Sequence, residues 1–320
     1  MTPAVGLAQA VQTGKDAAAS TIGKGRLGGS ATFENDVGIG TFVRNDYSDD
    51  AYFAQSLRLL PTYGLFKNVT AQADQTIEWE WTSPSDAGAG PSGRHWEIDD
   101  MILRLSHSSL YRDERLTGIN LSGAFSAALP FSHDSRWRDY ITKLTATGSL
   151  DRTFLNRLTT YYTLAVTKYV TSTPTRGEAD PGTDDDGNRS RLCSENDRCP
   201  GVGGTNLNFA FRNTLGLVYR FTDKFSAGML LRFTTYLKYK IGDKSDPENV
   251  DGTANRYRYT YTLGDISGSY AINDRYSVSA GISSEQLSVD QRGTPRFPWF
   301  DFETSKENYT TIYVSGTATF

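Results

Sequence analysis

Apolar and polar residues alternate strictly between Phe225 and Ile241. Phenylalanine, methionine, leucine and other apolar residues occupy most odd positions, whereas serine, arginine, lysine and threonine recur at even ones. A period of two places the two sets on opposite faces of one strand. Strands of soluble proteins usually run for about 5–6 residues. The segment therefore predicts an unusually long strand with one apolar and one polar face.

The same alternation recurs along the chain from Ser30 and predicts about twelve strands. The segments are 33–43, 53–63, 69–81, 101–105, 119–129, 140–150, 158–166, 207–221, 225–241, 256–272, 276–289 and 304–320. Short turns are predicted near 65–68, 111–115, 151–156, 222–224 and 273–275, and longer polar loops near 44–50, 83–97, 130–138, 172–205, 242–255 and 290–303. A soluble sandwich is not expected to produce this regular succession of short and long connections.

The last strand carries the most specific signal. It ends at Phe320, and Ile312, Val314 and Ala318 share the face of that terminal residue. The segment resembles the closing strand of Gram-negative outer-membrane β-barrel proteins, although the resemblance identifies no subfamily. It covers about residues 30–320 and implies an all-β fold: a transmembrane antiparallel up-and-down β-barrel with short periplasmic turns and long extracellular loops. It also implies the outer membrane of a Gram-negative bacterium as the location.

Physical reasoning favours apolar residues outside such a barrel. A sheet in lipid must close on itself so that no backbone group stays unpaired. Twelve strands enclose a wide lumen, which the apolar side chains are too small to fill. Aromatic residues at strand ends fit the interfacial girdles of these barrels. The candidates are Tyr63, Trp79, Trp81, Tyr239, Tyr257, Tyr259 and Tyr276.

The alternation changes phase at two places. Between Leu263 and Ile266 the apolar residues move from odd to even positions, and a bulge at Gly264 and Asp265 would restore the pattern. A second change between Ser284 and Leu287 is interpreted as the strand leaving the membrane.

Composition excludes several other classes. The 320 residues include 18 Tyr, 16 Phe and 5 Trp, too many aromatic side chains for a disordered chain. No segment resembles a spanning helix of about 20 apolar residues. A net charge of −4 provides no basic footprint for nucleic acid. Three His and two Cys leave little room for a metal site built from these ligands.

The polar faces predict two oppositely charged walls in the lumen. The acidic wall comprises Glu34, Asp36, Asp74, Glu78 and Glu80, with Arg58 and Arg104 on neighbouring strands. The basic wall comprises Arg212, Arg220, Arg232, Lys238, Lys240 and Arg256, with Asp265 as the local acid. Because these charges interleave across adjacent strands, an ion-pair network between the acids and the neighbouring arginines is predicted. The basic wall either guides anions or pairs with loop acids and lipid headgroups, and sequence leaves these two alternatives open.

The predicted loop 172–205 carries two further candidates. Cys193 and Cys199 are expected to form a disulfide in an oxidising compartment. Asp184, Asp186 and Asn188 resemble the alternating oxygen ligands of calcium loops. No bidentate glutamate follows at the usual distance, so a solvated acidic loop is favoured over a calcium site, and no other cofactor is expected.

Residues 1–29 lack strand alternation and are predicted to form a periplasmic tail or a plug of the lumen, outside the barrel of residues 30–320. The first residues, from Met1 to Leu7, also lack the features of a secretory signal, so the signal of an exported protein is expected to lie outside this numbering.

The favoured function is a channel for small hydrophilic solutes, with anionic or sugar-like solutes preferred because of the basic wall. The alternative is a non-conducting barrel that anchors or assembles a cell-envelope complex for secretion, adhesion or motility. Expected partners are outer-membrane lipid and lipopolysaccharide, small solutes and, under the alternative, envelope proteins. A lipid-modifying enzyme is a weaker hypothesis. It rests on two His-x-Ser pairs, His107 with Ser109 and His133 with Ser135, and no enzyme is expected.

Overall fold

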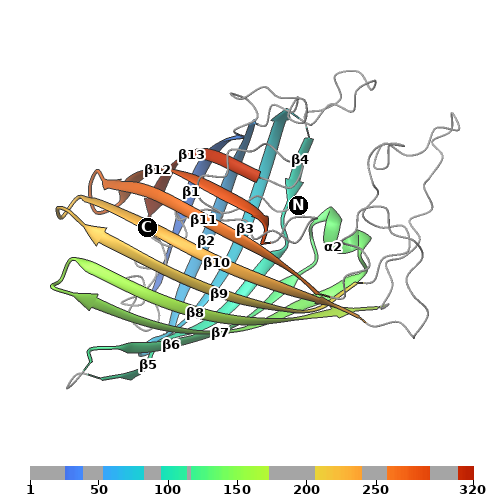
Figure 1. The fold of residues 1–320 in the computed structure, drawn as a ribbon, viewed down its shortest axis with the longest axis horizontal. Helices are drawn as coiled ribbons and strands as arrows, with labels where there is room; N and C mark the ends of the chain where they lie inside the picture. Colours follow the sequence, from blue (N-terminus) through green and yellow to red (C-terminus); the bar gives the residue numbers. More distant parts are fainter. Residues whose placement is uncertain are drawn as a thin grey trace, which may run out of the picture.

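The computed structural model describes residues 26–38, 53–82, 95–113, 117–172, 206–239, 258–288 and 309–320. These residues form one antiparallel sheet that closes on itself, drawn as a ring of tilted strands in Figure 1. The turns that join β7 to β8, β9 to β10 and β11 to β12 gather at one end of the ring, and α2 lies at the other. We call these the turn end and the loop end.

The sheet contains thirteen strands. Their bounds are β1 (Leu27–Gly38), β2 (Phe53–Phe66), β3 (Val69–Thr82), β4 (His95–Ile98), β5 (Met101–Arg112), β6 (Asn120–Leu129), β7 (Tyr140–Phe154), β8 (Leu158–Thr171), β9 (Leu207–Arg220), β10 (Phe225–Lys238), β11 (Arg258–Ala271), β12 (Tyr276–Leu287) and β13 (Tyr309–Thr319). The helix α2 (His133–Trp137) lies between β6 and β7. Both β4 and β5 pair with β3, so they share one place in the ring, which therefore has twelve places. The predicted barrel and its strand number are confirmed.

The ring closes where the first strand meets the last: β1 pairs with β13 on one side and with β2 on the other. Among the described strands, the twelve longer ones each have a partner on both sides, whereas the short β4 pairs only with β3. Where β1 meets β13, Gly29 and Phe320 exchange two backbone hydrogen bonds of 3.0 and 3.1 Å. A side chain at Gly29 would lie only 2.7 Å from the Leu60 carbonyl oxygen and 3.0 Å from the Phe320 ring. Residues 27–29, grouped with the N-terminal segment in the sequence analysis, thus form part of the first strand.

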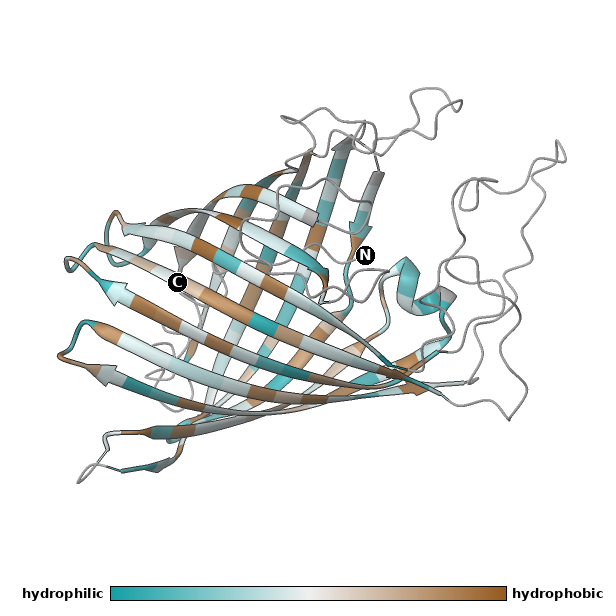
Figure 2. Ribbon diagram, viewed as in Figure 1, coloured by the Kyte–Doolittle hydropathy of each residue, from teal (hydrophilic) through white to brown (hydrophobic). Residues whose placement is uncertain are grey.

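Apolar side chains cover the outside of the barrel. Phe33, Phe125, Leu215 and Val314 are 43, 52, 58 and 54% exposed, whereas inward Ser30, Thr32 and Ser315 are almost fully buried. Alternating bands of hydropathy along each strand are visible in Figure 2. A water-soluble barrel would show the reverse arrangement, so this polarity defines a membrane-spanning β-barrel. No helix in the described ranges has the length and apolar character needed to cross a membrane.

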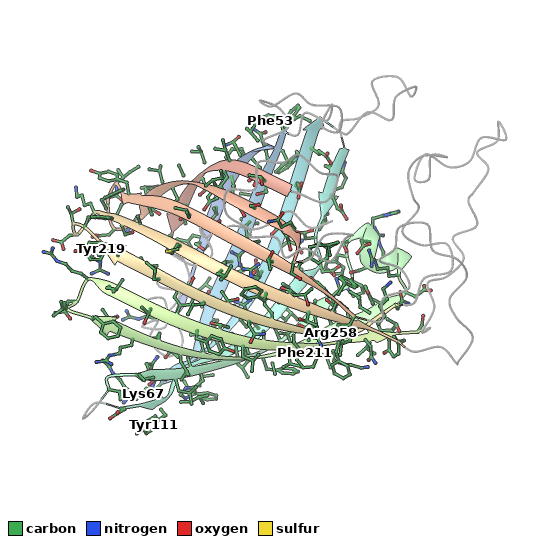
Figure 3. All side chains as sticks on the ribbon, viewed as in Figure 1. Phe53, Lys67, Tyr111, Phe211, Tyr219 and Arg258 are labelled. Carbon is green, nitrogen blue, oxygen red and sulfur yellow. The ribbon has the colours of Figure 1, made fainter. Side chains whose placement is uncertain are left out.

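Aromatic residues mark both ends of the outer surface. Tyr63 and Tyr276 are exposed near the turn end, and Trp81 is exposed at the end of β3 that faces the loops, as the girdle prediction requires. Figure 3 labels Tyr219 and Phe211, which lie toward opposite ends of β9. Tyr257 lies outside the described residues.

The predicted bulge at Gly264 and Asp265 is wrong. β11 pairs with β10 and β12 in continuous register through both residues. The inner face itself changes character: it carries Asp265 in the middle of the barrel and Leu263 closer to the loop end, both almost fully buried. Alternation in the sequence shows that the two faces of a strand differ, but not which face points inward. Where the inward residues change from polar to apolar, the sequence pattern therefore looks the same as a change of register. The register of β12 is likewise continuous from Ser284 to Leu287.

Arginine on the lipid face of β7 should destabilise the barrel more than arginine on its lumen face. Ala146 points outward near the middle of the strand, and its neighbour Thr147 lines the lumen. Ala146→Arg is expected to lower the free energy of unfolding by about 2–4 kcal/mol, because the charge enters lipid. Thr147→Arg should change it by less than about 1 kcal/mol. Urea unfolding in phospholipid vesicles measures both values, and equal losses would contradict the assignment of the two faces.

Candidate solute pathway in the barrel lumen

The lumen contains a cavity of about 1600 Å³. Inward residues of β3 to β10 form most of its lining, together with one residue each of β2 and β12 and two of β11. Residues between the strands complete it: 99 and 100, 132 and 134, 156 and 157, and 222–224. The described residues of β1 and β13 do not line it, although their inward side chains are buried. The open space therefore lies against one side of the barrel, and the wall of β1, β13 and β12 is closely packed.

The predicted acidic wall divides between these two regions. Asp74, Glu78 and Glu80 on β3 line the cavity. Glu34 and Asp36 on β1 are only 6 and 5% exposed and lie in the packed wall, away from the cavity lining. Asp74 accepts hydrogen bonds from Arg58 Nε at 2.7 Å and from its terminal nitrogen at 2.5 Å. The ion pairing predicted between neighbouring strands is thus present at Asp74.

A bulge adds two carboxylates that sequence analysis missed. Ile77 pairs with Ile98 and Asp74 pairs with Ile102, so three steps along β3 face four steps along the opposite strand. In a regular strand Asp99 and Asp100 would point to opposite faces. The extra residue lets both line the cavity. Two adjacent aspartates between apolar runs were the available signal, but they resemble a turn as much as a bulge.

Asp100 ties α2 to the barrel wall. Its carboxylate accepts hydrogen bonds from the Ser132 amide at 3.0 Å and hydroxyl at 2.8 Å, from the Ser135 hydroxyl at 2.5 Å and from Lys143 Nζ at 2.6 Å. Ser132 is the N-cap of α2, and its hydroxyl also accepts from the Ser135 amide at 3.1 Å. One carboxylate therefore holds both the start of α2 and the lysine at the start of β7.

The other end of this connection is fixed as well. Arg138 donates from Nε to Asp134 at 2.6 Å, and its carbonyl accepts from the Asn206 side chain at 3.0 Å. Burial of the guanidinium opposes its charge, but the Asp134 carboxylate raises the pKa of Arg138 above its ordinary value. Because Ser132 and Asp134 also line the cavity, α2 forms part of its rim at the loop end.

The predicted basic wall is partly in the cavity. Arg212 and Arg220 on β9 and Arg232 on β10 line it. Lys238 is 7% exposed, is not among the lining residues, and lies 5.8 Å from the centre of the Tyr259 ring. Lys240 and Arg256 lie outside the described residues.

Arg212 and Arg232 lie close enough for their charges to interact, and Glu285 on β12 is the acid beside them. Within the described ranges, neither arginine forms an ion pair with a carboxylate. Arg232 also has a buried Nε without a hydrogen-bond partner among the described residues. These two guanidinium groups are therefore available to an anion in the lumen.

Tyrosines cluster on the inner wall toward the loop end. Tyr236 lines the cavity and stacks on Tyr259, with ring centres 5.1 Å apart, and Tyr261 packs edge-on against both rings. Tyr169 also lines the cavity and lies 5.3 Å from the Tyr140 ring. The assignment of Tyr259 to the outer girdle is thus wrong, because its strand keeps one register and places this residue inside.

Hydroxyl groups separate the two charged walls. Half of the residues through which β6, β7 and β8 line the cavity are serine or threonine, and several pair across strands, as Thr145 does with Thr167 at 2.9 Å and Ser149 with Thr163 at 2.8 Å. These serines and threonines belong to the polar faces predicted from the sequence, where no role was expected for them. With the acids of β3, β4 and the bulge at residues 99 and 100 on one side and the arginines of β9 and β10 on the other, they complete a polar lining.

The remaining candidates do not assemble a site. His107 accepts a hydrogen bond at Nδ1 from the Ser109 amide at 3.3 Å, and the Ser135 hydroxyl is bound to Asp100. Neither described His-x-Ser pair thus shows a hydrogen bond between hydroxyl and imidazole. Cys193, Cys199, Asp184, Asp186 and Asn188 lie outside the described residues. Among the residues described, no group of three or more acids, histidines or cysteines is arranged to hold a metal ion.

Comparison with known proteins identifies the fold. No family model and no curated protein sequence matches the chain. The solved outer membrane channel from Pseudomonas putida F1 is similar at a TM-score of 0.54, with 13% identity over 94% of this chain and 97% of that one. The NanC porin has a TM-score of 0.46, with 9% identity over 90 and 98% of the two chains. The KdgM porin has a TM-score of 0.43, with 8% identity over 91 and 99%.

The fold is that of Gram-negative outer-membrane β-barrel proteins. Its closed ring and apolar exterior place the chain in the outer membrane, with the turn end on the periplasmic side and the loop end outside. Sequence identities this low show the shared architecture alone.

Asp100→Asn should release α2 without opening the barrel. The substitution removes the charge that binds Lys143 and weakens the acceptor of the serine hydroxyls, so amide exchange in residues 132–138 is expected to accelerate by about tenfold or more. Asp99→Asn provides the matched control, since Asp99 occupies the same bulge but, among the side chains that the structure describes, has no hydrogen bond to α2. Hydrogen exchange followed by mass spectrometry measures both. Equal protection of α2 in the two variants would show that Asp100 does not hold it.

Proposed function

We propose that this protein is an outer-membrane channel that passes small hydrophilic solutes and prefers anionic or sugar-like ones. The observation that carries this proposal is the open cavity of about 1600 Å³ containing two arginines without ion-pair partners among the described residues. Closed ligand pockets usually measure about 300–1000 Å³, so this space exceeds what a single small-molecule site needs. The similar structure from Pseudomonas putida F1 is itself described as an outer membrane channel.

The lining supports passage of polar solutes. Hydroxyl groups of β6 to β8 exchange hydrogen bonds readily with water and with sugars. Arg212 and Arg232 attract anions, and the acids of β3, β4 and the bulge at residues 99 and 100 face them from across the lumen. In a low-dielectric barrel such opposed charges create a field that orients polar solutes and favours one sign of ion.

Channel activity is tested by conductance of the purified protein in planar lipid bilayers. Under a salt gradient, the reversal potential is expected to show anion selectivity. Arg212→Ala combined with Arg232→Ala should keep the conductance but reduce or reverse this selectivity, because the positive charges at the centre of the lumen are removed.

Arg258→Ala controls for a change of net charge alone. This arginine is exposed at the loop end of β11, is labelled in Figure 3, and does not line the cavity. Its loss is expected to leave the selectivity unchanged. A barrel that inserts into the bilayer but never conducts would refute the channel and favour an anchoring role, with loops or surface as the working parts. Cation selectivity in the unmodified protein would refute the preference for anions.

A further inference from the structure

We propose that β8, β9 and β10 build a specific binding site for one carboxylate of a hydroxylated ring compound, that is, a sugar acid of the uronic type. Arg212, Arg232 and the Tyr161 hydroxyl would bind the carboxylate, and Tyr236 would contact the ring. This inference rests on the proposed function and deepens it: solutes of this class would occupy a saturable site on their way through the lumen.

Strand register places the donors together. Arg232 pairs with Thr214 on β9, and Thr214 pairs with Thr163 on β8. One step toward the loop end on the same inner face, Arg212 pairs with Thr234. One step toward the turn end, Tyr161 pairs with Gly216. The donors thus occupy three successive steps on three adjacent strands.

Gly216 allows Tyr161 to lean across β9 toward Arg232. A Cβ atom at position 216 would lie 2.2 Å from Tyr161 Cζ and 2.3 Å from its hydroxyl oxygen. The tyrosine ring therefore occupies the space that any other residue would fill. An aromatic ring laid over a glycine on the adjacent strand is a known way to stabilise a sheet. Here it also directs the hydroxyl toward β10, where Arg232 stands.

The donors lack acceptors. The Tyr161 hydroxyl and Arg232 Nε are both buried without a hydrogen-bond partner among the described residues, and Tyr161 interacts electrostatically with Arg232. Buried polar groups in folded proteins are nearly always hydrogen-bonded, and leaving a donor unpaired is costly. A carboxylate satisfies such a set well, because its two oxygens accept several hydrogen bonds and match the planar guanidinium.

The local charge disfavours a second negative charge on the ligand. The two guanidinium groups stand near the Glu285 side chain, and the Asp265 side chain lies near Tyr161, where it accepts hydrogen bonds from the Tyr313 hydroxyl at 3.2 and 3.3 Å. A monocarboxylate brings one negative charge to the two arginines, whereas a phosphate or dicarboxylate would bring a second one toward these acids and is disfavoured.

The surroundings select a hydroxylated ring. Tyr236 stands one step beyond Arg212 toward the loop end, in register with Ala210, and Thr167 pairs with the same Ala210. Because Tyr236 is stacked on Tyr259, its ring is held in place at the cavity wall. Flat faces of sugar rings pack against such aromatic surfaces, while Thr163 and Thr167 offer hydroxyl groups to the ring substituents. Carboxylate donors, ring surface and hydroxyl groups thus lie within four successive steps of the wall.

Three matched compounds separate the parts of this site. Glucuronate carries both the carboxylate and the ring hydroxyls, glucose lacks the carboxylate, and cyclohexanecarboxylate lacks the hydroxyls. Binding to the purified protein in detergent is measured by isothermal titration calorimetry, which does not depend on conductance. Block of ion current in planar bilayers is the second readout. Glucuronate is expected to bind with one site and to reduce the current saturably, at least about tenfold more tightly than either other compound.

Variants then assign the donors. Tyr161→Phe should weaken glucuronate binding by about tenfold and leave the weaker binding of glucose unchanged. Gly216→Ala should do the same by displacing the tyrosine. Arg212→Ala and Arg232→Ala are each expected to weaken glucuronate by about tenfold or more. Arg220→Ala is the matched control, since it lines the same cavity on the same strand but at the turn end.

The outcomes distinguish this site from the channel itself. If the protein conducts anions but glucuronate neither binds nor blocks saturably, the site is refuted and the channel stands. If glucuronate binds but the barrel never conducts, the channel is refuted and the site stands. Equal affinity for glucuronate and cyclohexanecarboxylate would overturn the assignment to sugar acids. Equal losses from Tyr161→Phe and Arg220→Ala would overturn the placement of the site, because only general charge or folding would then explain them.

Discussion

Closure of the hydrogen-bonded ring is the constraint on which the rest of this structure depends. A sheet in hydrocarbon cannot leave an edge unpaired, so the first and last strands must meet. They do so where Gly29 and Phe320 exchange backbone hydrogen bonds, and the absence of a side chain at Gly29 lets the ring of Phe320 and the carbonyl of Leu60 approach. Once the ring is closed, each strand has a lipid face and a lumen face. Every charged residue of the strands then has to be accommodated on the inner side or at the ends.

That inner side is not used uniformly. Toward β1 and β13 it is closely packed and buries even Glu34 and Asp36, whereas toward β3 to β10 it stays open. The acids of the open part lie mainly on β3, on β4 and at residues 99 and 100, with two arginines beside them, and further arginines lie on β9 and β10, with hydroxyl groups on the strands between. The helix α2, fastened by Asp100, shapes the outer rim of the same space. Solute selection would therefore depend on one side of the barrel.

Alternation and the terminal phenylalanine were sufficient to predict the class of fold and the number of strands. The sequence-based predictions failed where the answer depended on strand register or on which face of a strand points inward. Tyr259 and Leu263 are apolar residues that face inward, so the pattern suggested a bulge that the continuous pairing of β11 excludes. The real bulge at Asp99 and Asp100 escaped notice because it depends on how β3 pairs with two separate strands. Likewise, only the register of three neighbouring strands shows that Tyr161, Arg212 and Arg232 lie close together. Local sequence does not contain that information.

The pair of Tyr161 and Gly216 has a consequence for reading other barrels of this kind. The tyrosine can take its position only because the residue opposite it has no side chain. Two positions far apart in sequence are thus constrained to vary together, although only one of them would touch a solute. In a related chain, a bulky residue at the place of Gly216 would indicate that the neighbouring tyrosine points elsewhere, even if every arginine of the wall were retained.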